Sequence, residues 1–111
     1  AAKEKFGLVI ADPPAFVKRK KDLVEGRIAY RRLNELGMQV LARDGILVTC
    51  SCSWHMPRAA LLDAVQQGAR HLDRQAQLLF PLHQGPDHPV HPAIPETDYL
   101  KGFILRILPA A

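Results

Sequence analysis

Short apolar runs alternate with longer amphipathic stretches along this chain of 111 residues. The runs at residues 8–10 and 45–50 are too short for helices and rich in β-branched residues, which is typical of strands buried on both faces of a parallel sheet. Residues 26–43 carry apolar side chains at helical spacing, namely Ala29, Leu33, Leu36 and Val40. This order predicts a βαβ unit with two adjacent parallel strands.

The second half of the chain continues the same alternation. Residues 56–71 predict a helix, with Pro57 in its first turn. Its apolar face consists of Leu61, Leu62 and Val65. Residues 75–80 and 102–108 predict two further strands, and Pro81 is expected to end the first of them.

Turn and loop signals separate these elements. Asp44 and Gly45 predict a turn before the second strand, with Gly45 available for a left-handed backbone conformation. Residues 82–95 are rich in proline and predict an extended, irregular loop, which is long for a compact domain. The first strand begins almost at once, so we expect that the chain starts in the middle of a domain.

Composition is that of a soluble globular domain, with 48% hydrophobic and 23% charged residues. No apolar run reaches membrane-spanning length. The formal charge of +4 favours an anionic partner such as RNA. Cys50 and Cys52 are too close for a disulfide and lack zinc-site spacing, so we expect free thiols in a reducing, cytoplasmic protein. His83, His88 and His91 have no regular ligand spacing, and no metal site is predicted.

Candidate chemistry follows the first two strands. Asp12 ends the first strand, and Pro13 and Pro14 prevent further strand pairing. If the strands are parallel, Asp12 and the cysteine segment meet at the same edge of the sheet, where open α/β folds bind their ligands. Carbonyl groups of Asp12 and Pro13 can accept hydrogen bonds from a ligand amino group. A plain strand-ending turn is the alternative interpretation of this motif.

Residues 17–22 form a basic loop beside this edge. A solvated surface loop and a phosphate-contacting loop are both compatible with the pattern. Its proximity to Asp12 supports the phosphate-contacting interpretation.

Two motifs together resemble a known family. The segment Asp12-Pro13-Pro14-Ala15-Phe16 and the segment Ser51-Cys52-Ser53 are similar to motifs of class I S-adenosylmethionine-dependent methyltransferases. Within these, the chain resembles bacterial 23S ribosomal RNA cytosine-C5 methyltransferases that carry an N-terminal PUA domain. Supporting similarities are Tyr30 near the start of a helix and the segments Asp87-His88-Pro89-Val90 and Tyr99-Leu100-Lys101-Gly102-Phe103.

The resemblance implies a fold and a cofactor. Residues 1–111 would form one partial α/β domain with a Rossmann-like fold, containing strands four to seven of a seven-stranded sheet. This is the C-terminal half of the catalytic domain, so most of the S-adenosylmethionine site would lie upstream. We therefore expect this chain alone to bind the cofactor weakly, through Asp12 and Pro13. Without strands one to three, the strand near Val9 is an open edge that favours a homodimer.

The resemblance also implies residue roles. Cys52 would attack C6 of a cytosine in ribosomal RNA, and Asp12 would bind the base edge. Cys50 is expected to pack inside the strand. Substrate contacts are expected from six further residues: Pro13, Pro14, Phe16, Ser51, Ser53 and Lys101. Phe16 would stack on or wall the base, and Lys101 would contact phosphate.

Two other functions stay open. A methyltransferase acting on a guanine or adenine nitrogen of RNA could use the same fold without a cysteine. A half-domain that binds RNA without catalysis is also compatible with the sequence.

Overall fold

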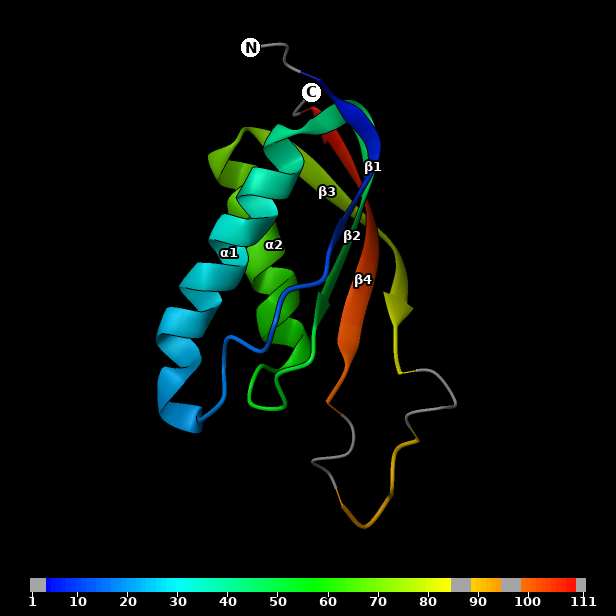
Figure 1. Ribbon diagram of the computed structural model, residues 1–111. Helices are drawn as coiled ribbons and strands as arrows, with labels where there is room; N and C mark the ends of the chain where they lie inside the picture. The colour runs from blue at the N-terminus through cyan, green and yellow to red at the C-terminus, as the bar shows by residue number, and fades with distance from the viewer. Residues whose placement is uncertain (1–3, 85–88, 95–98, 110–111) are drawn as a thin grey trace.

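The computed structural model describes residues 4–84, 89–94 and 99–109. Its elements are β1 (Phe6–Ala11), the 3-10 turn η1 (Lys20–Asp22), α1 (Leu23–Gln39), β2 (Leu41–Ser51), α2 (Arg58–His71), β3 (Arg74–Leu82) and β4 (Lys101–Pro109). The predicted order of strands and helices is therefore confirmed, with boundaries shifted by up to four residues. Figure 1 shows the sheet beside the two helices.

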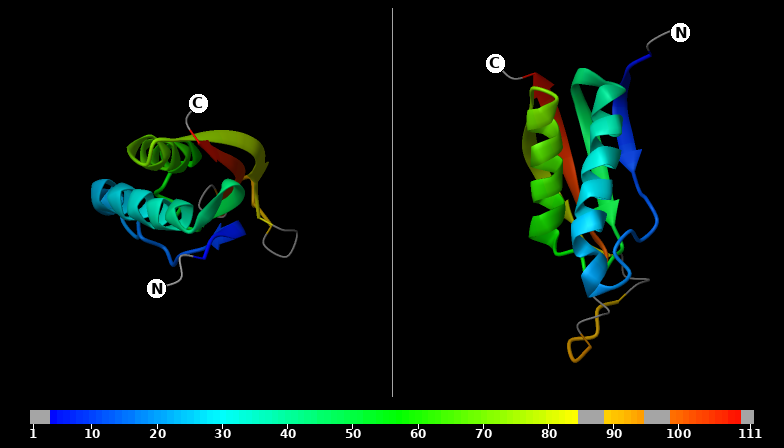
Figure 2. Two further views of the ribbon diagram at one scale, coloured as in Figure 1. Left: turned by 90° about the horizontal axis from the view of Figure 1, so that it is seen from above. Right: turned by 90° about the vertical axis from the view of Figure 1, so that its left-hand side faces the viewer.

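The four strands form one sheet in the order β1-β2-β4-β3. The strands β1 and β2 are parallel neighbours, as predicted. The last strand, β4, lies between β2 and β3 and runs antiparallel to both. Figure 2 shows that α1 and α2 cover the same face of this sheet.

The core lies between that face and the two helices. Alternate residues of the central strands are fully buried there, including Leu47 of β2 and Leu105 and Ile107 of β4. Leu61 and Val65 of α2 are also fully buried, which confirms the apolar face predicted for this helix.

The face predicted for α1 is wrong at Leu36 and Val40, whereas Ala29 and Leu33 are partly buried. Leu36 is 61% exposed and Val40 is exposed, whereas Tyr30, Asn34 and Met38 are fully buried. The reason is the close packing of α1 against α2, where a Cβ atom added at Gly68 would lie 3.0 Å from the side chain of Glu35. The buried stripe is therefore set by the facing helix and not by the most apolar side chains of α1.

The turn predicted at Asp44 and Gly45 is also wrong, because both residues lie within β2. Among the described residues no glycine has a positive φ. The strand bulges instead: Leu41 pairs with Phe6 and Ile46 pairs with Leu8, so β2 advances five residues (41 to 46) while β1 advances two (6 to 8). Helix α1 correspondingly ends at Gln39 and not at residue 43.

Arg74, at the start of β3, holds this bulge together. Its guanidinium donates to the carbonyl oxygens of Ala42 and Arg43, each at 2.9 Å. It also donates to Met38 at the end of α1 at 2.9 Å and to Ile107 of β4 at 3.0 Å. Burial lowers the pKa of the Arg74 guanidinium. Bulged carbonyls need such partners because they lack regular ladder partners.

We predict that Arg74→Ala lowers the free energy of unfolding by about 3 kcal/mol, because several carbonyls lose a charged donor at once. Arg74→Lys should recover only part of this loss, since one ammonium cannot replace a planar fork of donors. Urea unfolding measures both effects. Arg70→Ala is the matched control, as Arg70 is an exposed arginine at the end of α2. A change below about 0.5 kcal/mol in Arg74→Ala would contradict this role.

Strand β1 is not buried on both faces as predicted. Leu8 is 54% and Ile10 is 64% exposed, while Val9 faces α1, where its side chain lies 3.5 Å from a Cβ added at Gly37. The physical reason is that β1 is an edge strand of the described sheet and that both helices cover the opposite face.

Pro81 does not end β3, which continues to Leu82 with Pro81 paired to Phe103. A proline is tolerated there because β3 is an edge strand. In the following loop, His91 and Ile94 form one isolated bridge. Asp87 and His88 lie outside the described residues. No helix in the described part of the chain is long and apolar enough to cross a membrane.

Candidate active site at the carboxyl edge of the sheet

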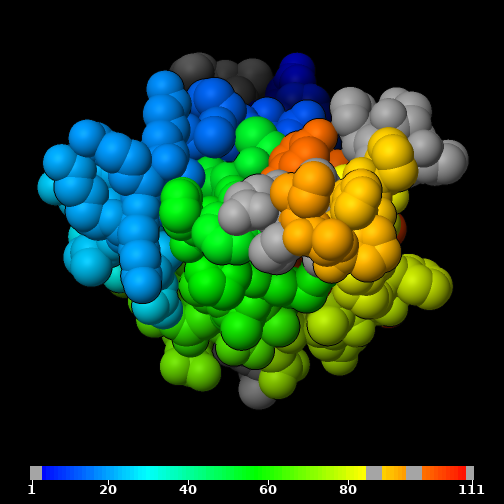
Figure 3. All heavy atoms as spheres, turned by 90° about the horizontal axis from the view of Figure 1, so that it is seen from below, coloured from blue at the N-terminus to red at the C-terminus, as the bar shows by residue number. Residues whose placement is uncertain are grey.

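The carboxyl ends of β1 and β2 meet at one edge of the sheet, as the sequence predicted. Ala11 pairs with Thr49, so Asp12 leaves β1 beside Cys50, and Cys52 follows two residues later. Figure 3 looks onto this end of the molecule, where the loops after β1 and β2 lie together with the segment near residue 90. The fold therefore gathers a carboxylate and two thiols from neighbouring strands.

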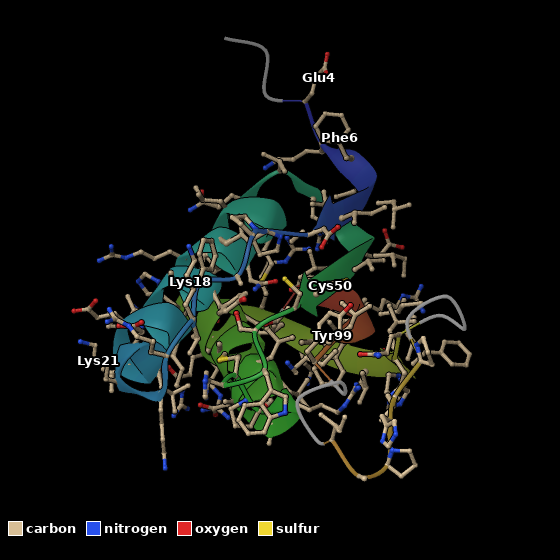
Figure 4. The ribbon with its side chains drawn as sticks, turned by 60° about the horizontal axis from the view of Figure 1, so that its bottom comes forward. Glu4, Phe6, Lys18, Lys21, Cys50 and Tyr99 are labelled. Carbon is tan, nitrogen blue, oxygen red and sulfur yellow. The ribbon has the colours of Figure 1, made fainter. Side chains whose placement is uncertain are left out.

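The two cysteines have different surroundings, although both are free thiols. Cys50 lies within β2, close to the end of the strand (Figure 4), and its sulfur is 3.1 Å from the position of a Cβ added at Gly102. Burial, and then the negative charge of Asp12, raise the pKa of the Cys50 thiol. Cys52 lies beyond the end of the strand and is partly exposed. At neutral pH, Cys50 therefore has a smaller thiolate fraction than an ordinary thiol.

We predict that a small alkylating reagent modifies Cys52 faster than Cys50 at pH 7.5. Because the pKa of Cys50 is raised, its thiolate fraction at a given pH is smaller than that of an ordinary thiol, and its labelling should rise only at higher pH. Mass spectrometry of the tryptic peptides of Cys52→Ala and Cys50→Ala proteins separates the two rates. Faster labelling of Cys50 would contradict this assignment.

The serines that flank Cys52 turn inward. Ser51 is fully buried and Ser53 is nearly so, and both hydroxyl groups contact the hydroxyl of Tyr30, at 2.8 and 3.0 Å. Lys101 is also buried, and its ammonium donates to the carbonyls of Ser53 at 2.6 Å and Tyr99 at 2.5 Å. Substrate contacts by Ser51, Ser53 and Lys101 stay predictions. In the structure, these three side chains make hydrogen bonds within the protein.

The residues after Asp12 also lie at this edge of the sheet. Pro13 is partly buried and Pro14 is exposed. Phe16 packs edge-on against Tyr30, with ring centroids 4.8 Å apart. Its stacking on a base stays a prediction. Tyr30 has no role predicted from the sequence, although a tyrosine buried in a helix generally needs a partner for its hydroxyl.

Basic side chains surround the edge. Lys18 and Lys21 belong to the exposed loop before α1, and Figure 4 shows them on its outer side. Arg58, at the start of α2, lies 5.5 Å from the ring centre of Phe103 and donates to His83 at 2.9 Å.

Three hollows lie elsewhere on the described part of the chain. One lies between α1 and α2, and two others lie near Arg74. None of these three is lined by Asp12 or Cys52. In residues 4–84, 89–94 and 99–109, no three histidine, cysteine or acidic side chains gather as a metal site would require.

Comparison with solved structures defines the class of fold. The chain superimposes on SMU.776, described as a methyltransferase complexed with SAH, with a TM-score of 0.74 and 20% identity. The superposition covers 93% of this chain and 26% of the SMU.776 chain. A second structure, described as a SAM-dependent methyltransferase from Streptococcus mutans, gives a TM-score of 0.71. The fold is therefore the α/β, Rossmann-like fold of these methyltransferases, over the part that the chain covers.

Particular relatives are found by sequence. The chain is 41% identical over 108 residues to the ribosomal RNA large subunit methyltransferase I of Pseudoalteromonas atlantica. It is 40% identical over 103 residues to the protein of that name from Aeromonas salmonicida. These alignments cover 97% and 93% of this chain but 27% and 26% of the relatives, so the chain spans about a quarter of their length. No family model matches the chain.

Proposed function

We propose that this chain is part of an S-adenosylmethionine-dependent methyltransferase that modifies C5 of a cytosine in large-subunit ribosomal RNA. The observation that carries this proposal is the meeting of Asp12 and Cys52 at the ends of two parallel neighbouring strands. Similarity to large-subunit ribosomal RNA methyltransferases over nearly the whole chain supports the substrate class. Ribosomal RNA as substrate and free thiols both agree with a cytoplasmic protein.

Cys52 supplies the nucleophile. C5 of cytosine is a weak nucleophile, and covalent catalysis overcomes this weakness. The thiolate of Cys52 forms a bond to C6, and the electron pair of the C5–C6 double bond makes C5 reactive. After methylation a base removes the proton from C5, the double bond re-forms and the thiolate leaves. The partial exposure of Cys52 beyond the end of β2 supports its access to a flipped base.

Asp12 binds the polar edge of the base. Its carboxylate is exposed at the end of β1, where it can accept a hydrogen bond from N4 and stabilise a proton on N3. A proton at N3 offsets the negative charge that develops when the thiolate adds. The carbonyl of Pro13 provides a further acceptor for N4. Phe16 lies in the same loop, where its side chain can pack against the cytosine ring.

The residues at this edge fit only one end of the cofactor. S-adenosylmethionine, when bound, supplies an electrophilic methyl group from a positively charged sulfonium. The carboxylate of Asp12 and the carbonyl of Pro13 are acceptors that suit its cationic methionine end. Under this proposal the chain is the C-terminal half of a catalytic domain. The contacts to the adenosine would then come from residues upstream of this chain in the longer protein.

The product distinguishes this function from its alternatives. The full-length protein is incubated with unmodified large-subunit ribosomal RNA and labelled S-adenosylmethionine, and the digested nucleosides are identified by mass spectrometry. We expect 5-methylcytidine. Detection of an N-methylated guanosine or adenosine would favour the nitrogen methyltransferase over the proposed chemistry. RNA binding without methyl incorporation would favour a role in RNA binding without catalysis.

Self-association of the isolated chain through β1 is a separate prediction. The comparisons give no support for a homodimer, and the prediction depends on the exposed side chains of Leu8 and Ile10 on an edge strand. The 12.4 kDa chain should sediment as a dimer or larger species, and Ile10→Lys should shift it toward monomer. Val24→Lys, at a 71% exposed site on α1, is the control that should leave association unchanged. A wild-type monomer would refute the prediction.

A further inference from the structure

A buried polar cluster lies directly behind Cys52. It consists of Tyr30 of α1, Ser51 at the end of β2, Ser53 after it and Lys101 at the start of β4. Tyr30 and Ser51 are fully buried, and Ser53 and Lys101 are 2% and 6% exposed. Polar groups buried to this extent must satisfy one another, so their mutual geometry is strongly determined.

The hydroxyl of Tyr30 is the centre of this cluster. Ser51 donates to it at 2.8 Å, and it lies 3.0 Å from the hydroxyl of Ser53. The backbone amide of Ser53 in turn donates to the hydroxyl oxygen of Ser51 at 3.2 Å. Both residues that flank Cys52 are thus anchored to one phenol, and the cysteine between them is the partly exposed member of the three.

The same cluster also reaches the loop that follows Asp12. The backbone amide of Val17 donates to the hydroxyl of Ser53 at 3.1 Å, and Val17 is 1% exposed. Phe16 rests edge-on against the ring of Tyr30. Tyr30 therefore contacts both segments whose relative position matters for the proposed reaction, the one that carries Cys52 and the one that follows Asp12. Lys101 closes the arrangement by donating to the carbonyl of Ser53.

We infer that Tyr30 is a positioning residue whose hydroxyl sets the Cys52 segment against the Asp12–Phe16 loop, so that thiol and carboxylate reach one base. This inference rests on the proposed function. An attacking atom must lie within about 3–3.5 Å of its target, and a displacement of about 1 Å can cost roughly 100-fold in rate. Tyr30 acts through the backbone of its neighbours and touches no substrate atom.

The test compares Tyr30→Phe with Thr49→Val in the full-length protein. The first variant keeps the ring against Phe16 but deletes the hydroxyl. The second removes another fully buried hydroxyl, that of Thr49 on β2, which makes no hydrogen bond in the structure. If the hydroxyl positions Cys52, Tyr30→Phe should lower kcat by about 10- to 100-fold with little change in KM for RNA. Thr49→Val should keep the wild-type kcat.

Two measurements do not depend on methyl transfer. Amide exchange at Val17 and Ser53 should become about tenfold faster in Tyr30→Phe, because one link of the cluster is lost. The alkylation rate of Cys52 should change in Tyr30→Phe and stay constant in Thr49→Val. Unchanged exchange and alkylation in Tyr30→Phe, or an unchanged kcat in an active enzyme, would overturn the inference. Altered exchange and alkylation in a protein without methyltransferase activity would support positioning while refuting the proposed function.

Discussion

Replacing Cys52 by alanine in the full-length protein is expected to lower methyl transfer by at least about 10³-fold. Without the thiol no bond to C6 can form, and positioning alone cannot replace a covalent step. The partly exposed place of Cys52 after β2 makes it the candidate for this attack. Single-turnover methylation of the RNA measures the effect directly, without interference from product release.

Cys50→Ala is the matched control for this experiment. It removes a thiol two residues away, whose pKa is raised by burial and by Asp12. We expect a stability loss of about 1 kcal/mol and nearly full activity, because a small packed group is lost and not a chemical step. RNA containing 5-fluorocytosine should become covalently trapped on wild-type and Cys50→Ala proteins, since fluorine at C5 leaves no proton for the base to remove and the thiolate cannot be eliminated.

Trapping, methyl transfer and RNA binding together separate three cases. Trapping lost only in Cys50→Ala would keep the mechanism and exchange the two thiols. Equal methyl transfer by wild type and Cys52→Ala would refute the covalent mechanism and leave the nitrogen methyltransferase as the better interpretation. Loss of RNA binding in Cys52→Ala would show that the variant disturbs more than the chemistry.

Replacing Asp12 by asparagine should lower kcat by about 10²- to 10³-fold, the usual cost of removing a group that stabilises developing charge. The amide keeps the shape of the side chain but cannot hold a proton at N3. The KM for RNA should change little, because phosphate contacts supply most of the affinity for RNA. The same variant should let the pKa of Cys50 fall, since the charge of Asp12 helps to raise it.

Asp22→Asn provides the control for the charge change. Asp22 lies in the same connection between β1 and α1 and pairs with Arg19 at 3.3 Å. Its replacement should leave both kcat and the alkylation of Cys50 at wild-type values. If Asp12→Asn alters the alkylation of Cys50 but keeps full activity, Asp12 lies beside the thiols without serving the reaction.

Much of the fold could be predicted from the sequence because its determinants are local. Apolar runs and helical spacing identified the four strands and two α-helices of the described residues in order, whereas the short 3-10 helix at Lys20–Asp22 was expected only as part of a loop. The parallel pairing of β1 and β2 followed from the helix between them, since such a connection returns the chain to the same edge of the sheet. That step alone placed Asp12 and the cysteine segment together.

Other features depend on residues far apart in the chain. The insertion of β4 between β2 and β3 is decided by antiparallel pairing across more than fifty residues, for example Thr49 with Phe103. The start of β2 is a bulge and not a turn because Arg74 supplies donors for its carbonyls. The local sequence around Asp44 and Gly45 cannot indicate a contact with Arg74, which lies thirty residues away in the chain.

The candidate site divides in the same way. Its residue types and their strand-end positions were determined by the sequence alone: a carboxylate after β1 and thiols at the end of β2. Only the tertiary structure decided that Ser51 and Ser53 turn inward, because the phenol that receives them comes from α1. Burial of a hydroxyl costs less free energy when it has a hydrogen-bond partner, and the partner of these two serines depends on the packing of helix on sheet, which no local sequence pattern encodes.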